Sequence, residues 1–188
     1  MNDRRRLLGA RRPPREELNV SDLLGSPEFH FSICLKRRKE LMIATGKALD
    51  EPQIRKLMDD RVKAVRTKDV NASMSNLGPD ILSFDVVNPL QRIGVESSRK
   101  RAEEWFSSFH GPIGYEIRDL VITAGDDVAF CHGLSHVSAT RIDGGQLDMW
   151  WRTTVCFRKT DGKWLVTHEH NSVPFDMKSG KASLGLKP

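Results

Sequence analysis

The residues with the greatest capacity for chemistry gather in one stretch, 160–174, which reads TDGKWLVTHEHNSVP. Its second half predicts a β-strand, in which successive side chains point to opposite faces. His168 and His170 would share one face, and Glu169 and Asn171 the other. Polar groups on both faces indicate a polar cavity on one side of the strand and a wet or partner-covered surface on the other.

Two carboxylates are candidates for acid/base chemistry. Asp85 ends a short predicted strand, 80–85, and Glu169 lies in the last strand. Two carboxylates in one apolar cavity raise each other's pKa by desolvation and like-charge repulsion, which poises a general base near neutral pH. In the alternative interpretation Asp85 caps a loop and Glu169 pairs with Arg152 on the outer surface.

Histidines and cysteines offer weaker chemistry. His168 and His170 could bind a metal together with His132 or His136, because histidines two apart on a strand project from the same face. No spacing fixes a third ligand, so we expect hydrogen-bonded histidines and no metal. The three cysteines show no paired spacing, and no phosphate-cradling glycine loop is present, so we also expect no disulfide framework and no cofactor.

The turn before the last strand decides which of its faces lines the cavity. A three-residue turn, 160–162, would place Trp151, Thr153 and Val155 on the face of Glu169 and Asn171. A two-residue turn would instead align them with His168 and His170, which share a face of the strand with Val166. A difference of one residue in register therefore decides the composition of the cavity wall.

Three helices are predicted before the sheet. The first opens at Asp50, with Pro52 in its first turn, and the second covers 70–77. The third begins after Ser97 or Ser98 and ends at 111–112. It carries a stripe of apolar side chains: Ala102, Trp105, Phe106 and Phe109.

The β-rich half follows in four long runs joined by short turns: 115–123, 128–140, 146–159 and 164–173. Such short connections impose an antiparallel meander, and helices followed by a sheet give an α+β fold. Runs this long indicate a strongly curved sheet that wraps the helices. The pocket should lie between the helical stripe and the concave sheet, near Trp105, Phe109 and Asp85.

Composition and charge limit the partners. The chain has 188 residues, 38% of them hydrophobic, and a net charge of +5. Residues 1–41 hold ten basic and six acidic residues, so most of the charge belongs to the leader. We therefore predict a basic, disordered extension over 1–46, one domain over 47–188 and no nucleic-acid partner. No run of about 18 apolar residues and no secretory signal is apparent, so we expect no membrane partner and a cytoplasmic location.

The order of helices and strands, with DILSFD after the second helix and DGKWLVTHEHNSVP at the end, resembles the SnoaL-like, ketosteroid-isomerase-like members of the nuclear transport factor 2-like superfamily. The resemblance covers about 50–175. It implies a cone-shaped fold with a deep pocket and dimers formed through the outer face of the sheet. It also implies that Asp85, five residues after Asp80, is the general base, and that Glu169, seven residues after Gly162, is a second acid/base group.

The last hairpin also resembles the association domain of calcium/calmodulin-dependent kinases, which assembles subunits and is not catalytic. By that resemblance Asn171 should face the pocket. The remaining pocket residues that we predict are Trp105, Phe109, His132, Trp151 and His170.

The expected function is acid/base catalysis on a small hydrophobic carbonyl compound by an isomerase, cyclase or dehydratase. The alternative is a non-catalytic binding or oligomerisation module. We expect a homodimer in which Trp150 or Trp151, with Val155, is covered on the outer face of the sheet.

Overall fold

The computed structural model describes residues 27–188, with side chains described at 35–37 and throughout 50–188. The chain divides into two units between Met42 and Ile43, and the second unit, Ile43–Pro188, carries the fold described here. The predicted basic extension lies outside the described residues as far as position 26. The rest of the predicted extension, residues 27–46, lies in a helix.

Three helices precede most of the sheet within the described residues: α2 (Pro27–Arg66), α3 (Val70–Met74) and α4 (Val95–Ser107). Several predicted helix boundaries are wrong; α3, for example, ends at Met74 and not at residue 77. Helix α2 begins at Pro27 and not at Asp50. The Asp50 carboxylate does not cap a helix; it accepts hydrogen bonds from Lys159 Nζ (2.6 Å) and Trp164 Nε1 (2.9 Å) of the sheet. Phe109 begins a strand and does not belong to α4. No helix within 27–188 is long and apolar enough to cross a membrane.

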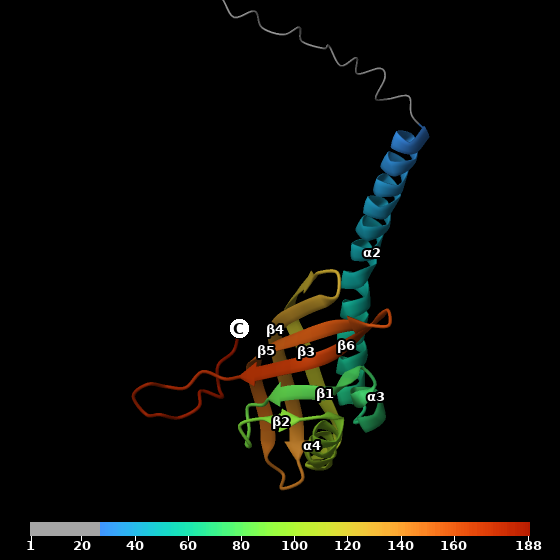
Figure 1. Cartoon of the computed structure of the whole chain (residues 1–188). Helices are drawn as coiled ribbons and strands as arrows, with labels where there is room; N and C mark the ends of the chain where they lie inside the picture. Colours follow the sequence, from blue (N-terminus) through green and yellow to red (C-terminus); the bar gives the residue numbers. More distant parts are fainter. Residues whose placement is uncertain (1–26) are drawn as a thin grey trace, which may run out of the picture. The chain divides into compact units, whose positions relative to one another are not determined.

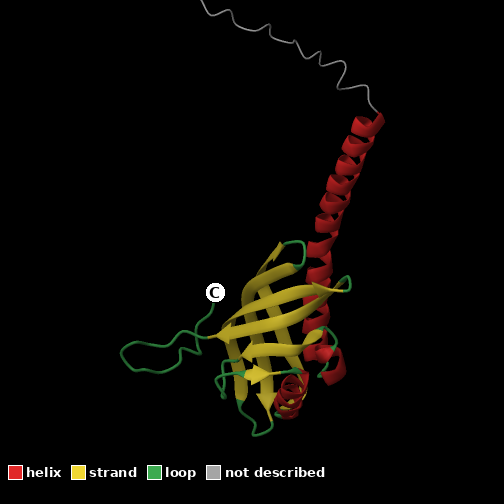
Figure 2. Cartoon of the chain, in the orientation of Figure 1, coloured by secondary structure: helices red, strands yellow, loops and turns green. Residues whose placement is uncertain are grey.

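The sheet has six strands in the order β2-β1-β6-β5-β4-β3 (Figures 1 and 2). Their bounds are β1 (Leu77–Phe84), β2 (Arg92–Ile93), β3 (Phe109–Ala124), β4 (Val128–Arg141), β5 (Gln146–Thr160) and β6 (Lys163–Ser172). Strands β3 to β6 form the predicted antiparallel meander, and β1 joins β6 in parallel. The α+β fold with a curved, unclosed sheet is confirmed.

One face of the sheet holds the hydrophobic core. Ile54 and Met58 of α2 pack on side chains of β4, β5 and β6, among which Val155 is fully buried. A second cluster joins Val65 of α2 and Phe106 of α4 to β3 and β4. The helices therefore cover the inner face of the sheet. Val155, which we predicted on the outer face, lies in this core.

The last hairpin turns through two residues. Thr160 pairs with Lys163, and both turn residues have positive φ, 51° at Asp161 and 76° at Gly162. This backbone is the type I′ form whose twist matches the flanking strands, and glycine adopts it without a steric penalty. Of the two turn lengths considered from the sequence, the shorter is the one found.

A β-bulge then reverses the alternation of β6. Phe157 pairs with Val166, but the next residue of β5, Cys156, pairs with His168, so Thr167 is an extra residue in β6. One extra residue in a strand exchanges the side chains that point to its two faces. The predicted sharing of one face by Val166 and His168 is therefore wrong.

Beyond the bulge, Glu169 pairs with Val155 and Asn171 pairs with Thr153. Because Val155 and Thr153 are buried on the inner face, Glu169 and Asn171 point to the interior as well. The two-residue turn plus the bulge thus gives the cavity wall that we expected from the three-residue turn.

Candidate functional site

A cavity of about 380 Å³ opens between the inner face of the sheet and helices α2, α3 and α4. This volume falls within the range of about 300–1,000 Å³ that is usual for small-molecule sites. Much of the wall is aromatic or aliphatic, including Trp105, Phe106, Phe109, Ile117, Val137, Met149 and Trp151. The cavity can therefore enclose the apolar body of a small molecule.

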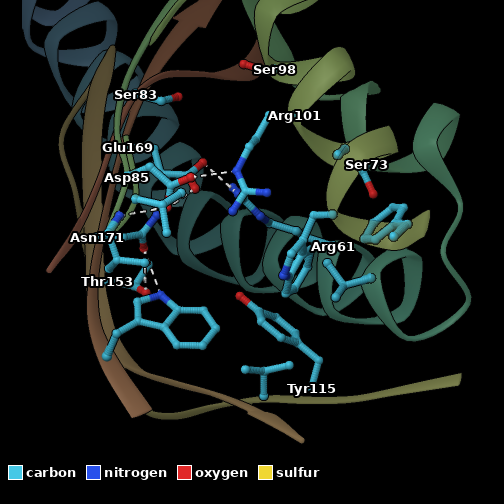
Figure 3. A pocket seen from close by; sticks show the side chains of 18 of the residues that line it. Arg61, Ser73, Ser83, Asp85, Ser98, Arg101, Tyr115, Thr153, Glu169 and Asn171 are labelled. Atoms are coloured by element: carbon cyan, nitrogen blue, oxygen red, sulfur yellow. Dashed lines mark hydrogen bonds and ion pairs between the residues drawn. The ribbon is translucent and has the colours of Figure 1, made fainter. Parts of the chain in front are cut away.

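Glu169 reaches this cavity from β6 and meets Arg61 of α2. Arg61 Nη2 donates a hydrogen bond of 2.6 Å to Glu169 Oε2. The two side chains keep 26% and 14% of their surface exposed, so the ion pair is largely removed from solvent. Arg61 and Arg101 both point toward the carboxylates of Glu169 and Asp85 in Figure 3.

The ion pair controls the protonation of both partners. Burial alone would raise the pKa of Glu169, but the charge and hydrogen bond of Arg61 outweigh it and hold the pKa below its usual range. Burial alone would lower the pKa of Arg61, yet attraction to Glu169 raises it. Both groups are therefore charged at neutral pH. The expectation that the pKa of Glu169 is raised is wrong, because its partner is a guanidinium.

A directed hydrogen-bond network fixes the orientation of Asn171. Trp151 Nε1 (3.0 Å) and Thr153 Oγ1 (2.9 Å) both donate to Asn171 Oδ1. Since an indole nitrogen can only donate, the atom that it contacts must be the amide oxygen. The amide nitrogen then donates to Glu169 Oε1 at 3.1 Å. With its proton committed to Asn171, Thr153 must accept from Ser135 Oγ at 2.7 Å.

Tyr115 of β3 adds a neutral hydroxyl to the cavity wall. Burial raises its pKa, and attraction to Arg61 and a hydrogen bond with Ser135 offset this only in part. The phenol is therefore protonated at neutral pH, and it donates its single proton to Ser135, because the Ser135 proton is committed to Thr153. Its ring contacts that of Trp151, with centroids 5.9 Å apart.

Asp85 lies just after β1 and holds two arginines. Arg101 Nε of α4 donates to its Oδ2 at 2.9 Å, and Arg92 Nη1 lies 3.6 Å from the same oxygen. The other oxygen accepts a hydrogen bond from the backbone nitrogen of Val86 at 2.7 Å. Asp85 is thus close to two guanidinium groups.

The structure brings together six of the eight site residues that we predicted from the sequence. All six line the cavity: Asp85, Trp105, Phe109, Trp151, Glu169 and Asn171. Trp105 and Phe109 are in edge-to-face contact at 5.6 Å, although they belong to different elements. Their predicted roles stay predictions, while their shared location follows from the fold.

Two predicted pocket residues, His132 and His170, do not line the cavity. Both are exposed on the outer face, where His170 contacts Phe84 at 5.6 Å and His132 stacks on Phe130. The bulge turns His170 outward, and His132 is one of the alternate residues of β4 whose side chains point away from the core. In the described part of the chain, no group of three or more histidine, cysteine or acidic side chains could hold a metal ion.

Sequence reasoning missed the arginines and Tyr115. Arg61 stands three residues after Met58 and four before Val65, so a charge on the apolar face of the first helix was the available signal. Arg101 precedes Trp105 by four residues and shares its helical face for the same reason. Arg92 and Tyr115 lie in irregular or strand segments, and no pattern in the sequence distinguishes them.

Comparisons with known proteins agree on the family. The model of the SnoaL-like domain matches residues 54–176. A solved NTF2-like protein of unknown function from Pseudomonas putida KT2440 is 33% identical, with a TM-score of 0.68, and the match covers 75% of this chain and 98% of that one. Among curated proteins, none matches this chain significantly.

More distant structures show the same fold. A protein of the NTF2-like family from Streptomyces avermitilis, provisionally named a dehydratase, is 14% identical, with a TM-score of 0.59 and coverage of 67% of this chain and 97% of that one. A protein from Xanthomonas campestris, provisionally named a calcium/calmodulin-dependent protein kinase II association domain, is 23% identical. Its TM-score is 0.56, with coverage of 63% and 84%.

Proposed function

Because the chain belongs to the SnoaL-like domain family of NTF2-like proteins, we propose that it binds one small hydrophobic carbonyl compound in its cavity and transfers a proton on it. The reaction would be an isomerisation, cyclisation or dehydration. The observation that carries the proposal is an ionised carboxylate, Glu169, inside a mainly apolar cavity next to a guanidinium and a neutral phenol.

Glu169 is the proton-transfer group that the geometry favours. It would remove a proton from the carbon next to the carbonyl group, and the electron pair of the broken C–H bond would form the C=C bond of an enolate. The carbonyl π electrons would move to the oxygen atom. Arg61 can donate a hydrogen bond to that oxygen, where negative charge develops, and Tyr115 can do the same once its hydroxyl rotates away from Ser135. Return of the proton at another carbon completes an isomerisation.

The Arg61 pair has two opposite effects on this step. It lowers the basicity of Glu169, which slows proton removal. It also supplies the cation that can follow the negative charge, because Arg61 can exchange its Glu169 partner for the enolate oxygen once Glu169 is protonated. Asn171 keeps its hydrogen bond to Glu169 and holds the carboxylate in place.

The test measures proton exchange, since this reports enolisation without knowledge of the product. Compact mono- and bicyclic ketones would be screened by thermal shift, because a ligand of the native state raises the melting temperature. Exchange of the α-proton in deuterium oxide would then be followed by NMR for each ketone that binds. Glu169→Gln should slow exchange by about 10² to 10⁴, while the exposed Glu51→Gln on α2 serves as the control.

A non-catalytic binding module is the second candidate. The observation that favours it is that every carboxylate oxygen of Asp85 and Glu169 already has a donor within hydrogen-bond or ion-pair distance. Ketone binding without accelerated exchange would support this candidate. Absence of ketone binding would contradict the proposed substrate class.

A further inference from the structure

The charged side chains at the Asp85 end of the cavity are not balanced, and the proposed function does not account for this. Arg92 and Arg101 both face one carboxylate, and no other acidic side chain forms an ion pair with either within the described residues. Glu169 is neutralised by Arg61. One positive charge is therefore uncompensated in a partly buried place, where an isolated charge is costly.

The free donors at this end have a definite geometry. Arg101 uses Nε to bind Asp85, so the fork of its two terminal nitrogens makes no hydrogen bond to the described residues. Its side chain is 25% exposed and lines the cavity. Arg92 donates through Nη2 to the Asn88 carbonyl oxygen at 2.7 Å, while its buried Nη1 has no hydrogen-bond partner in the described part of the chain.

We propose, on the basis of the proposed function, that the natural ligand carries a carboxylate which the guanidinium groups of Arg92 and Arg101 bind at the Asp85 end of the cavity. A guanidinium fork matches the two oxygens of a carboxylate, and such charge-assisted bonds are stronger than neutral ones. Asp85 then acts as a positioning residue that holds both arginines. The apolar body of the ligand lies toward Trp105 and Phe109.

The alternative is that this cluster only ties the loop after β1 to α4. A purely structural cluster needs one guanidinium for the Asp85 carboxylate, and the second would be an added cost. It would also give no reason for the free fork of Arg101 to border the cavity. The ligand class that follows is a compact aromatic or alicyclic monocarboxylate.

A matched pair of probes tests the inference: 2-naphthoate and its neutral isostere 2-naphthamide. Titration calorimetry on the full chain should show that naphthoate binds about 10- to 100-fold more tightly, the range expected for hydrogen bonds to charged groups. Arg101→Gln should remove most of this preference and leave the affinity for the amide unchanged. Arg99→Gln on the same helix is the control, because Arg99 does not line the cavity and donates to Asn71 Oδ1 (2.9 Å) on the surface.

Arg101→Lys keeps the charge but loses the fork, so it should lose part of the preference even if the Gln variant does not fold. Equal binding of the two probes, binding of neither at millimolar concentration, or a preference that survives in every folded Arg101 variant would overturn the inference. The Glu169→Gln variant separates the carboxylate site from the proposed function, because it should lose proton exchange and keep the preference for the carboxylate. Carboxylate preference without proton exchange would leave the inference standing and contradict the function, and exchange without preference would do the reverse.

Discussion

The coupling between Arg61 and Glu169 should be far stronger than the coupling within surface ion pairs of this protein. Two unit charges about 4 Å apart attract by about 4 kcal/mol at an effective dielectric constant of about 20. Some screening remains, since the side chains are 26% and 14% exposed, so we expect a coupling free energy of about 3 kcal/mol. Removal of one partner leaves the other charge unpaired inside the cavity.

A double-mutant cycle measures this coupling. Arg61→Met and Glu169→Gln should each lower the free energy of unfolding by about 3 kcal/mol, whereas the double variant should lose much less than the sum. Urea denaturation at pH 7 gives the three values. Arg55 and Glu51 on the same helix are the control pair, 46% and 54% exposed, for which about 0.3–0.5 kcal/mol is expected. A coupling as small as that of the control would refute the assigned burial and pairing.

The same pair sets a pH dependence with a definite sign. The folded-state pKa of Glu169 lies below its ordinary value of 4.5. Its stabilisation is therefore fully present above about pH 4.5 and is lost as the pH falls through the lower folded-state pKa. Between these limits, the free energy of unfolding of the wild-type protein should decrease more steeply than that of Glu169→Gln as the pH is lowered. Parallel curves would contradict the assignment.

Three further predictions concern the framework. Gly162→Ala, at φ 76°, should cost about 1 kcal/mol in denaturation because only glycine adopts this conformation freely. Asp50→Ala should cost about 2 kcal/mol, since Lys159 and the Trp164 indole lose their acceptor in a buried place, and a change below about 0.5 kcal/mol would show that the contact is dispensable. Light scattering should show a dimer of the wild-type protein. Phe130→Glu should convert it to monomers, because Phe130 lies on the outer face and is 42% exposed. A monomeric wild-type protein would contradict this, and a larger ring would favour the association-domain alternative.

The meander was predictable because the residue types at its turns indicate them locally in the sequence. The pair Asp161-Gly162 adopts positive φ at both positions, as such hairpin turns require. The aromatic stripe of α4 was predictable for a similar reason, since Trp105 and Phe106 follow the helical period toward the core. These signals involve residues that are close in the sequence, and they fix the elements without any knowledge of distant contacts.

The candidate site was less predictable, because distant pairings decide it. Thr167 is an ordinary β-branched strand residue, and nothing in its neighbourhood marks it as a bulge. The irregular pairing of β1 with β6 between Leu77 and Leu82 accompanies the bulge. The charge of the cavity was missed because carboxylates were considered without the guanidinium groups that the helices bring to them, 108 residues away in the case of Arg61 and Glu169.

The bulge at Thr167 also affects how this strand should be compared with others. The spacing of seven residues from Gly162 to Glu169 reaches the inner face only because one residue is extra. In a hairpin with the same turn and no bulge, the residue six positions after the glycine would point inward. Alignments that count positions from the turn would then equate an inner carboxylate with an outer side chain. Equivalent acids in such chains should be sought one residue earlier, and a single insertion or deletion here would exchange the inner and outer chemistry of half a strand.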